Sequence, residues 1–177
     1  ELTGSSSPKL KNRVLQPIDV SGGIKGQPQA WNWHIQNKLG DIYLGEWEDD
    51  HYQGEGILIR KNGERYEGQF NRGFQQGQGI YYFLDGRVFK GSWVNGEIQG
   101  QGAEEGVNFY EGEWLKGKYN GKGYLRLKEG TYQGDFHNGK PHGIGTFSND
   151  TLSYQGSFNA GCAAGPANVT YKTGEKL

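Results

Sequence analysis

Residues that could act as nucleophiles or bind a transition metal are few in this chain and are not grouped. The histidines are His34, His51, His137 and His142, and Cys162 is the single cysteine. One cysteine excludes an intramolecular disulfide and any multi-cysteine metal site. His137 and His142 are close in sequence, but a zinc site needs further ligands in the right geometry. We therefore predict no catalytic residue, no metal site and no bound cofactor.

Two other patterns match parts of enzyme active sites without completing one. Gly-x-Gly occurs five times, but a dinucleotide fingerprint needs a third glycine before a helix, and a phosphate-binding loop needs Gly-Lys-Ser/Thr. Carboxylates alternate with aromatic residues, which is typical of the solvated face of a strand, and a glycosidase would need two of them across a cleft. These carboxylates are Glu46, Glu48, Glu67, Glu111, Glu113 and Asp135. The chain is predicted not to be an enzyme.

The elements that carry these residues are defined by a repeated motif, Tyr/Phe-x-Gly-x-Trp/Phe. Its six copies recur about every 22 residues, a spacing typical of repeat architectures. They are Tyr43–Trp47, Tyr66–Phe70, Phe89–Trp93, Tyr110–Trp114, Tyr132–Phe136 and Tyr154–Phe158. Repeat proteins present an extended surface, so the search for function moves from a pocket to a face.

Each repeat has the pattern strand, turn, strand, turn. In a strand, positions i, i+2 and i+4 lie on one face, so Tyr43, Gly45 and Trp47 share a face. The Gly-x-Gly pairs, such as Gly54 and Gly56, are predicted to share a face of the second strand, where rings can cover bare backbone. Asn-Gly and similar pairs fall between the strands and favour short hairpin turns. These segments are 71–73, 95–96, 116–117 and 138–139, with 62–63 and 85–86 at the other end.

The overall composition suits a thin sheet. Glycine accounts for 32 of 177 residues and hydrophobic residues for 33%, which is low for a thick core but compatible with aromatic stacking. A net charge of −1 lacks the basic excess that nucleic-acid binding requires. No apolar run is long enough to span a membrane, and no signal-peptide pattern begins the chain. The absence of methionine leads us to expect a fragment or processed product, from which a targeting segment could have been removed.

The predicted fold class is all-β, an elongated single-layer antiparallel sheet of tandem ~22-residue β-hairpin repeats with about eleven or twelve strands. Residues 1–30 lack periodic aromatics and are predicted to be an N-terminal extension or linker. Residues 31–177 are predicted to form the repeat domain, with about five full repeats from residue 43, and residues 31–42 are predicted to be the second half of a degenerate opening repeat that caps the N-terminal end. Pro166 stands where earlier repeats have glycine, and proline suits an edge strand, so the last repeat is predicted to be a cap.

Two segments carry the family resemblance: Tyr110–Trp114 through Asn120-Gly121-Lys122-Gly123, and Tyr132 through Gly145. They resemble MORN (membrane occupation and recognition nexus) repeats. The resemblance implies a rod-like sheet without an active site, found in membrane–cytoskeleton linkers, ciliary and junctional scaffolds, and beside lipid kinase or methyltransferase domains. It also implies protein binding through a grooved face, dimerisation or contact with anionic phospholipid. The family's frequent histidine is kept only at His142; the equivalent residues are Gln53, Gln76, Gln99, Asn120 and Ala164.

The aromatic face admits two interpretations, which can both hold. The rings are the core, or a single layer leaves them partly open as a groove for an apolar helix or extended peptide. Further aromatics, Tyr81, Tyr82, Phe83, Tyr119, Tyr124 and Phe147, lie nearby in sequence. Because central aromatics dominate interfaces, the predicted partner-binding residues are Tyr66, Phe89, Trp93, Tyr110, Trp114 and Tyr132.

A basic cluster gives the alternative function, a peripheral membrane module. Lys116, Lys118, Lys122, Arg126 and Lys128 could meet anionic headgroups, each contributing about 1 kcal/mol near such a surface. Carbohydrate binding by stacked aromatics is a third hypothesis, disfavoured by the absence of a Trp-Tyr-Tyr signature. The expected partners are a protein, an anionic membrane surface or a second copy in a homodimer, and no nucleic acid. We expect an intracellular, cytoplasmic location at the cytoskeleton, cilium or membrane periphery.

Overall fold

The computed structural model describes residues 34–172, so the predicted extension of residues 1–30 lies outside the described residues. These residues form one 13-stranded antiparallel sheet in which every strand pairs with its neighbours in sequence. The strands are β1 (His34–Gln36), β2 (Ile42–Glu48), β3 (His51–Ile59), β4 (Arg65–Asn71), β5 (Phe74–Tyr82), β6 (Val88–Val94), β7 (Glu97–Glu105), β8 (Phe109–Leu115), β9 (Lys118–Leu127), β10 (Gly130–His137), β11 (Lys140–Ser148), β12 (Leu152–Asn159) and β13 (Cys162–Tyr171). The predicted all-β hairpin array is confirmed.

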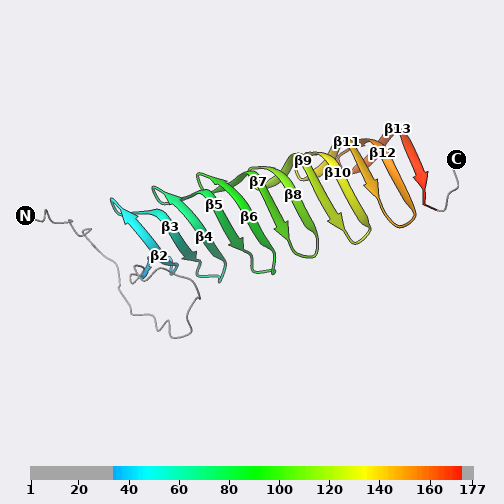
Figure 1. Ribbon diagram of the computed structural model, residues 1–177. Coiled ribbons are helices and arrows are strands. Elements are labelled where there is room, and N and C mark those ends of the chain that lie inside the picture. The colour runs from blue at the N-terminus through cyan, green and yellow to red at the C-terminus, as the bar shows by residue number, and fades with distance from the viewer. Residues whose placement is uncertain (1–33, 173–177) are drawn as a thin grey trace, which may run out of the picture.

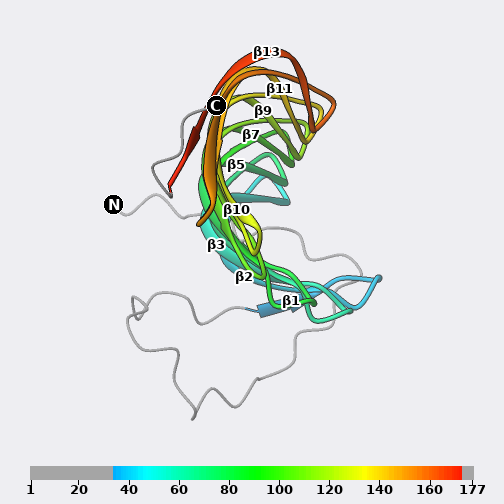
Figure 2. The same cartoon turned by 90° about the vertical axis from the view of Figure 1, so that its right-hand side faces the viewer.

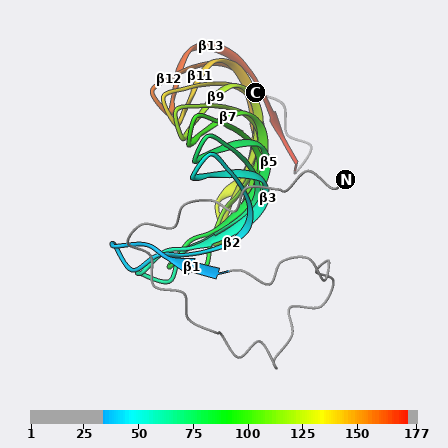
Figure 3. The ribbon, with the colours of Figure 1, turned by 90° about the vertical axis from the view of Figure 1, so that its left-hand side faces the viewer.

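The sheet is a single bent layer drawn out into a rod. Its hairpins follow one another along the long axis, with the two kinds of turn on opposite long edges (Figure 1). Seen nearly end-on, the strands fall behind one another in one curved profile, as Figure 2 and Figure 3 show from opposite sides. The bend gives the sheet an inner and an outer face, and it explains how a single layer can bury large rings.

A row of glycines crosses the sheet at right angles to the strands. Each strand from β2 to β12 contributes one glycine that pairs with the glycine of the next strand, and the row ends at Ala167 on β13. The prediction that Pro166 replaces a glycine of earlier repeats was therefore wrong, because Ala167 takes that place. A Cβ atom added to Gly79 would overlap the Tyr66 ring, and one added to Gly68 would lie 2.6 Å from the Cα of Gly79. The rings therefore lie directly on bare backbone, as the sequence predicted.

The first glycine of each Gly-x-Gly pair is favoured for a different reason, its backbone conformation. In each hairpin the register shifts at this point, which marks a β-bulge in the second strand. There Gly77 has φ 68° and Gly121 has φ 67°, a left-handed conformation that favours glycine. The prediction that the two glycines of a pair share a face was wrong. A Cβ atom added to Gly54 would meet the Glu46 carboxylate, whereas one added to Gly56 would meet the Tyr43 ring, because a bulge breaks strict alternation.

Hydrogen bonds fix this bend on both faces. The Tyr66 hydroxyl donates to the backbone oxygen of Gln69 at 2.9 Å, and four other repeats have the same bond, from Tyr43, Tyr110, Tyr132 and Tyr154. On the other side, Glu113 accepts from the backbone N–H of Lys122 in the bulge at 3.0 Å, as Glu46, Gln69 and Asp135 do in their repeats. Carboxylates expected only on a solvated face therefore also stabilise the bulges.

Two-residue turns join the strands of each hairpin along one long edge. At the turn formed by Arg72 and Gly73, the φ angles are 48° and 88°, the geometry that such turns require. The Gly73 N–H donates to the backbone oxygen of Tyr52 in the preceding hairpin at 2.9 Å, and this bond recurs at Gly96, Gly117, Gly139 and Gly161. The 62–63 turn differs from the prediction, because only its glycine has positive φ within a longer loop closed by Arg60 and Glu64.

Candidate functional site

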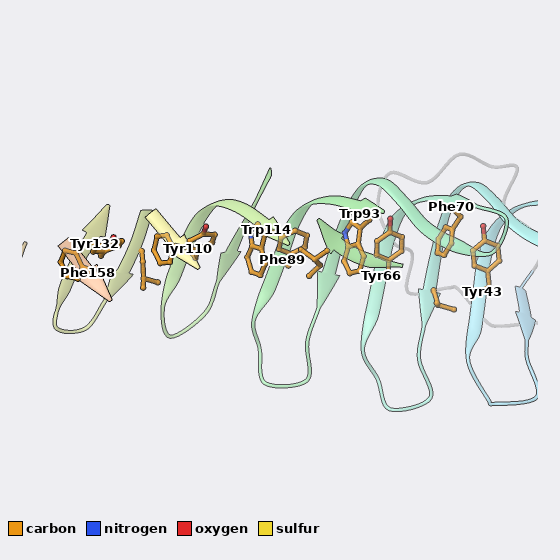
Figure 4. Close-up of a cluster of buried hydrophobic side chains, with 13 residues drawn as sticks. Tyr43, Tyr66, Phe70, Phe89, Trp93, Tyr110, Trp114, Tyr132 and Phe158 are labelled. Carbon is orange, nitrogen blue, oxygen red and sulfur yellow. The ribbon is translucent and has the colours of Figure 1, made fainter. Parts of the chain in front are cut away.

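The six residues predicted to bind a partner all lie in the core. Tyr66 is 1% exposed, and Phe89 and Tyr110 are fully buried. Together with Trp93, Trp114 and Tyr132 they form one row along the rod (Figure 4). The rings meet edge to face from repeat to repeat; Tyr66 and Trp93, for example, have ring centroids 5.1 Å apart. Of the two interpretations of these rings, the structure places these six side chains in the core.

A second row of side chains covers this core and is only half-buried. Tyr119 stacks on Tyr110 with ring centroids 3.7 Å apart, and Tyr52 stacks on Tyr43 at 3.9 Å. The other half-buried apolar members packed on the core include Tyr81, Phe83, Leu127, Phe147 and Tyr154. These residues form the accessible inner face. Most of them can be identified from the sequence by the alternation of inner and outer residues along the second strand of a hairpin, if the alternation is counted separately on each side of the bulge.

The remaining two of the nearby aromatics, Tyr82 and Tyr124, lie on the outer face of the sheet. Tyr82 neighbours Tyr81 in β5 and stacks under the Arg65 guanidinium at 5.0 Å. Tyr124 lies beside Phe109 with ring centroids 6.3 Å apart, on the outer face of the sheet. The aromatics therefore divide between two faces, and only the inner set borders the core row.

The inner face contains a hollow of about 290 Å³ that spans β5 to β7 and reaches the turn between β8 and β9. Its apolar wall includes Tyr81, Phe83 and Ile98, while Arg60, Glu97 and Lys116 bring both signs of charge to its rim. The buried indole N–H of Trp93 has no hydrogen-bond partner at the base of this region. A side chain of a bound peptide could fill the hollow, with rim charges fixing its register.

A carboxylate interrupts the inner face at the third repeat. Glu104 is 7% exposed and pairs with Phe89 and Tyr110, where the neighbouring repeats have Tyr81 and Leu125. It accepts hydrogen bonds from the Tyr119 hydroxyl and the Arg87 guanidinium, both at 2.9 Å. The row is thus polar at its centre, and every oxygen of this carboxylate has a partner, as burial of a charge requires.

Burial perturbs the inner tyrosines. It raises the pKa of Tyr132 to about 12, with the Asp135 carboxylate adding to the rise. Burial likewise raises the pKa of Tyr81 to about 12, helped by its hydrogen bond to the Glu64 carboxylate. The pKa of Tyr119 is raised by burial and then by Glu104. All these hydroxyls remain protonated at neutral pH, so they act as donors and not as bases.

The five basic residues of the alternative site do not form one patch. All are exposed, but they run along the β8–β9 hairpin, from Lys116 in one turn to Lys128 in the opposite one. Since β9 alone has 10 residues, the ends lie about 30 Å apart. Lys122 forms an ion pair with Asp135, and Lys118 donates to Asn138 at 2.9 Å.

The structure also bears on metal binding and membrane crossing. Within residues 34–172, no three His, Cys, Asp or Glu side chains are grouped so as to hold a metal ion. The rings of His137 and His142 lie 5.6 Å apart without a third ligand group in that described region. No helix of the described residues has the length and apolarity to cross a membrane.

Comparison with protein families agrees with this geometry. The MORN repeat profile matches five consecutive segments, residues 43–65, 66–86, 89–108, 110–131 and 132–150. The chain belongs to the MORN repeat family. Each MORN match begins at the first aromatic residue of a motif, and together the matches extend from β2 to β11. No curated protein matches the chain at a significant level.

Membership of the MORN family supports a coarse function. It suggests a repeat protein that acts in binding or membrane association, in a family that is generally non-enzymatic. The sixth MORN-like copy, Tyr154–Phe158, lies beyond the matched segments, yet it keeps the hydroxyl bond from Tyr154 to the Ser157 oxygen at 3.2 Å.

Proposed function

We propose that this MORN repeat protein is a non-enzymatic scaffold that binds a protein partner along its inner face. The observation that carries the proposal is the half-buried row of Tyr52, Tyr81, Phe83, Tyr119 and Phe147, packed over a fully buried core. Side chains already ordered by packing lose little entropy when a partner covers them. The partner would be an extended peptide or an amphipathic helix laid along the rod.

The hollow beside Phe83 supports the same proposal. Its volume of about 290 Å³ suits one or two large apolar side chains of a partner. Arg60, Glu97 and Lys116 all line this hollow, and they would select complementary charges beside that apolar anchor. Buried Trp114 then supports the binding face from below, and Trp93 forms the base of the hollow that the partner side chain would fill.

Substitutions on the two faces of β5 and its loop test the proposal. We expect Tyr81→Ser with Phe83→Ser to lose the partner captured by the immobilised wild-type protein. The matched control, Tyr82→Ser with Leu84→Ser, removes a tyrosine on the outer face and a leucine that is 64% exposed, and should retain it. Melting temperatures of both variants establish that they are folded. Equal capture by the inner-face and control variants would contradict the proposal.

An anionic membrane surface is the second candidate. The observation that favours it is that Lys116, Lys118, Lys122, Arg126 and Lys128 are all exposed on one hairpin. Binding to vesicles that contain anionic lipid should then weaken steeply with salt, and replacing the five with glutamine should abolish it. Vesicle sedimentation at low and high salt measures both effects. Salt-independent binding, or equal binding to neutral vesicles, would rule out this candidate.

We also propose an intracellular location, at the cytoskeleton, a cilium or the membrane periphery. Cys162 is a free and exposed thiol. Such a thiol persists more readily in a reducing compartment, where disulfides are rare. This observation supports the location without identifying the compartment.

A further inference from the structure

One residue of each hairpin pairs with the second aromatic of the motif and covers the core from the inner side. We call its place the covering position, and its six residues are Tyr52, Gln75, Ile98, Tyr119, Pro141 and Ala163. In the β2–β3 and β8–β9 hairpins it is a tyrosine whose ring is nearly parallel to the ring beneath, at 11° to Tyr43 and 7° to Tyr110. These two tyrosines flank two hairpins that have no ring at this position, whereas Pro141 and Ala163 end the row.

The hollow of about 290 Å³ on the inner face lies where those two rings are missing. Gln75 and Ile98 both line it and both are buried, so they form part of its floor. Neither extends as far from the backbone as a tyrosine ring does. Tyr81 and Phe83 add aromatic walls, with their ring centroids 4.8 Å apart. The hollow is therefore a gap in a row of stacked rings, and it is bounded by aromatic and aliphatic side chains.

The rim of this hollow favours a neutral polar group. Arg60, Glu97 and Lys116 line it, and Arg60 already forms an ion pair with Asp41 at 3.5 Å. A charged side chain that entered here would meet a like charge as well as an opposite one. A hydroxyl group, in contrast, can donate to a carboxylate and accept from a cation. Tyrosine combines such a hydroxyl with a flat apolar ring.

We propose that this hollow is the receptor site for one tyrosine side chain of the partner, which takes the place of the ring missing from the covering position. The inference rests on the proposed function and specifies the anchor of that partner. The ring would pack on Ile98 and against Phe83, with its hydroxyl at the charged rim. Aromatic anchors in pockets carry much of the energy of an interface, and tyrosine loses little conformational entropy when it is bound.

The free molecule p-cresol reproduces the tyrosine side chain and tests the site with a defined probe. Its ring current should move the δ1 methyl resonance of Ile98 upfield in NMR spectra of the full chain, and Ile98→Leu identifies that resonance. The shift should saturate, with a dissociation constant on the order of 1–10 mM for so small a ligand. The compound 4-methylcyclohexanol keeps the hydroxyl but lacks the flat ring, and should displace p-cresol at least tenfold less effectively.

A variant that supplies the missing ring from the chain itself should close the site. In Gln75→Tyr the p-cresol shift of Ile98 should disappear. The melting temperature should not fall, because Tyr52 and Tyr119 occupy the same position in their hairpins. The matched control, Ala163→Tyr, adds a ring at the covering position of the last hairpin and should retain p-cresol binding.

A second variant opens the site instead of filling it. Phe83→Ser removes part of the wall and should weaken p-cresol binding at least tenfold. No saturable shift in the wild-type protein, unchanged binding in Gln75→Tyr, or unchanged binding in Phe83→Ser would each overturn the proposal.

These outcomes separate the tyrosine anchor from the wider function. If p-cresol does not bind while Tyr81→Ser with Phe83→Ser still loses the captured protein, the inner face binds a partner but the tyrosine site is wrong. If p-cresol binds and Gln75→Tyr blocks it while that double variant retains the captured protein, the site stands and the scaffold proposal fails. When both proposals hold, Gln75→Tyr loses p-cresol and the captured protein together.

Discussion

Gly79→Ala is expected to lower the free energy of unfolding by about 3 kcal/mol, because one methyl group has no space in this part of the core. The added Cβ would overlap the hydroxyl end of the Tyr66 ring. That ring would have to rotate out of a site where it is 1% exposed, and its hydroxyl would lose the bond to the Gln69 oxygen. Chemical denaturation followed by circular dichroism measures the change.

Gly117→Ala is the matched control for this substitution. Gly117 has φ 72°, and a Cβ atom there would meet nothing within 4 Å. The control therefore reports only the cost of a left-handed backbone, about 1–2 kcal/mol. If Gly79→Ala costs no more than Gly117→Ala, the ring does not depend on the bare glycine, and our account of the glycine row is wrong.

Alkaline unfolding is the second large effect that we expect. Burial raises the pKa of Tyr81 and Tyr132 to about 12 from an ordinary value of 10.0, and it also raises the pKa of Tyr43, Tyr66, Tyr110 and Tyr119. The unfolded chain releases these protons near the ordinary value, whereas the folded sheet holds them. The stability from the protonated rings is therefore complete below about pH 10 and is lost as pH rises through about 12.

A pH titration that follows tyrosinate absorbance and circular dichroism together tests this expectation. Ionisation of the buried tyrosines should coincide with loss of the sheet. Tyr132→Phe removes one titrating group at a position where Phe89 already stands in its own repeat, so its unfolding free energy should fall less steeply with pH. Full tyrosine ionisation near pH 10 in a sheet that stays folded would contradict the raised pKa values.

Periodicity was sufficient to predict the fold, because the residues that specify each hairpin lie within one repeat. The spacing of Tyr66 and Phe70 and the Asn-Gly turn at Asn95 are local features, and local features specify hairpins that pair with their neighbours. The contact of Tyr66 with Gly79 was also predictable, since both belong to adjacent strands of one hairpin. A repeat array has few long-range contacts that could override such signals.

The accessible face could not be predicted, because it depends on a bend that alternation does not reveal. A flat sheet would leave the rings of Phe89 and Tyr110 half-exposed. The bulges at Gly100 and Gly121 bend the sheet around these rings and bury them. The burial of Glu104 was equally unpredictable from the sequence, because it depends on hydrogen bonds from Arg87 and Tyr119, which are distant in sequence. When the alternation of residues is counted through a bulge, the residues beyond it are assigned to the wrong face of the sheet.

The backbone bonds from the two-residue turns to the preceding hairpins give the rod a direction. Gly73 donates to the hairpin before it, and so do the turn glycines that follow, up to Gly161 and the Pro141 oxygen at 2.8 Å. In this set of bonds each hairpin thus presents an acceptor to its successor. A chain emerging from the ribosome could fold one hairpin at a time, each new one docking on a completed template.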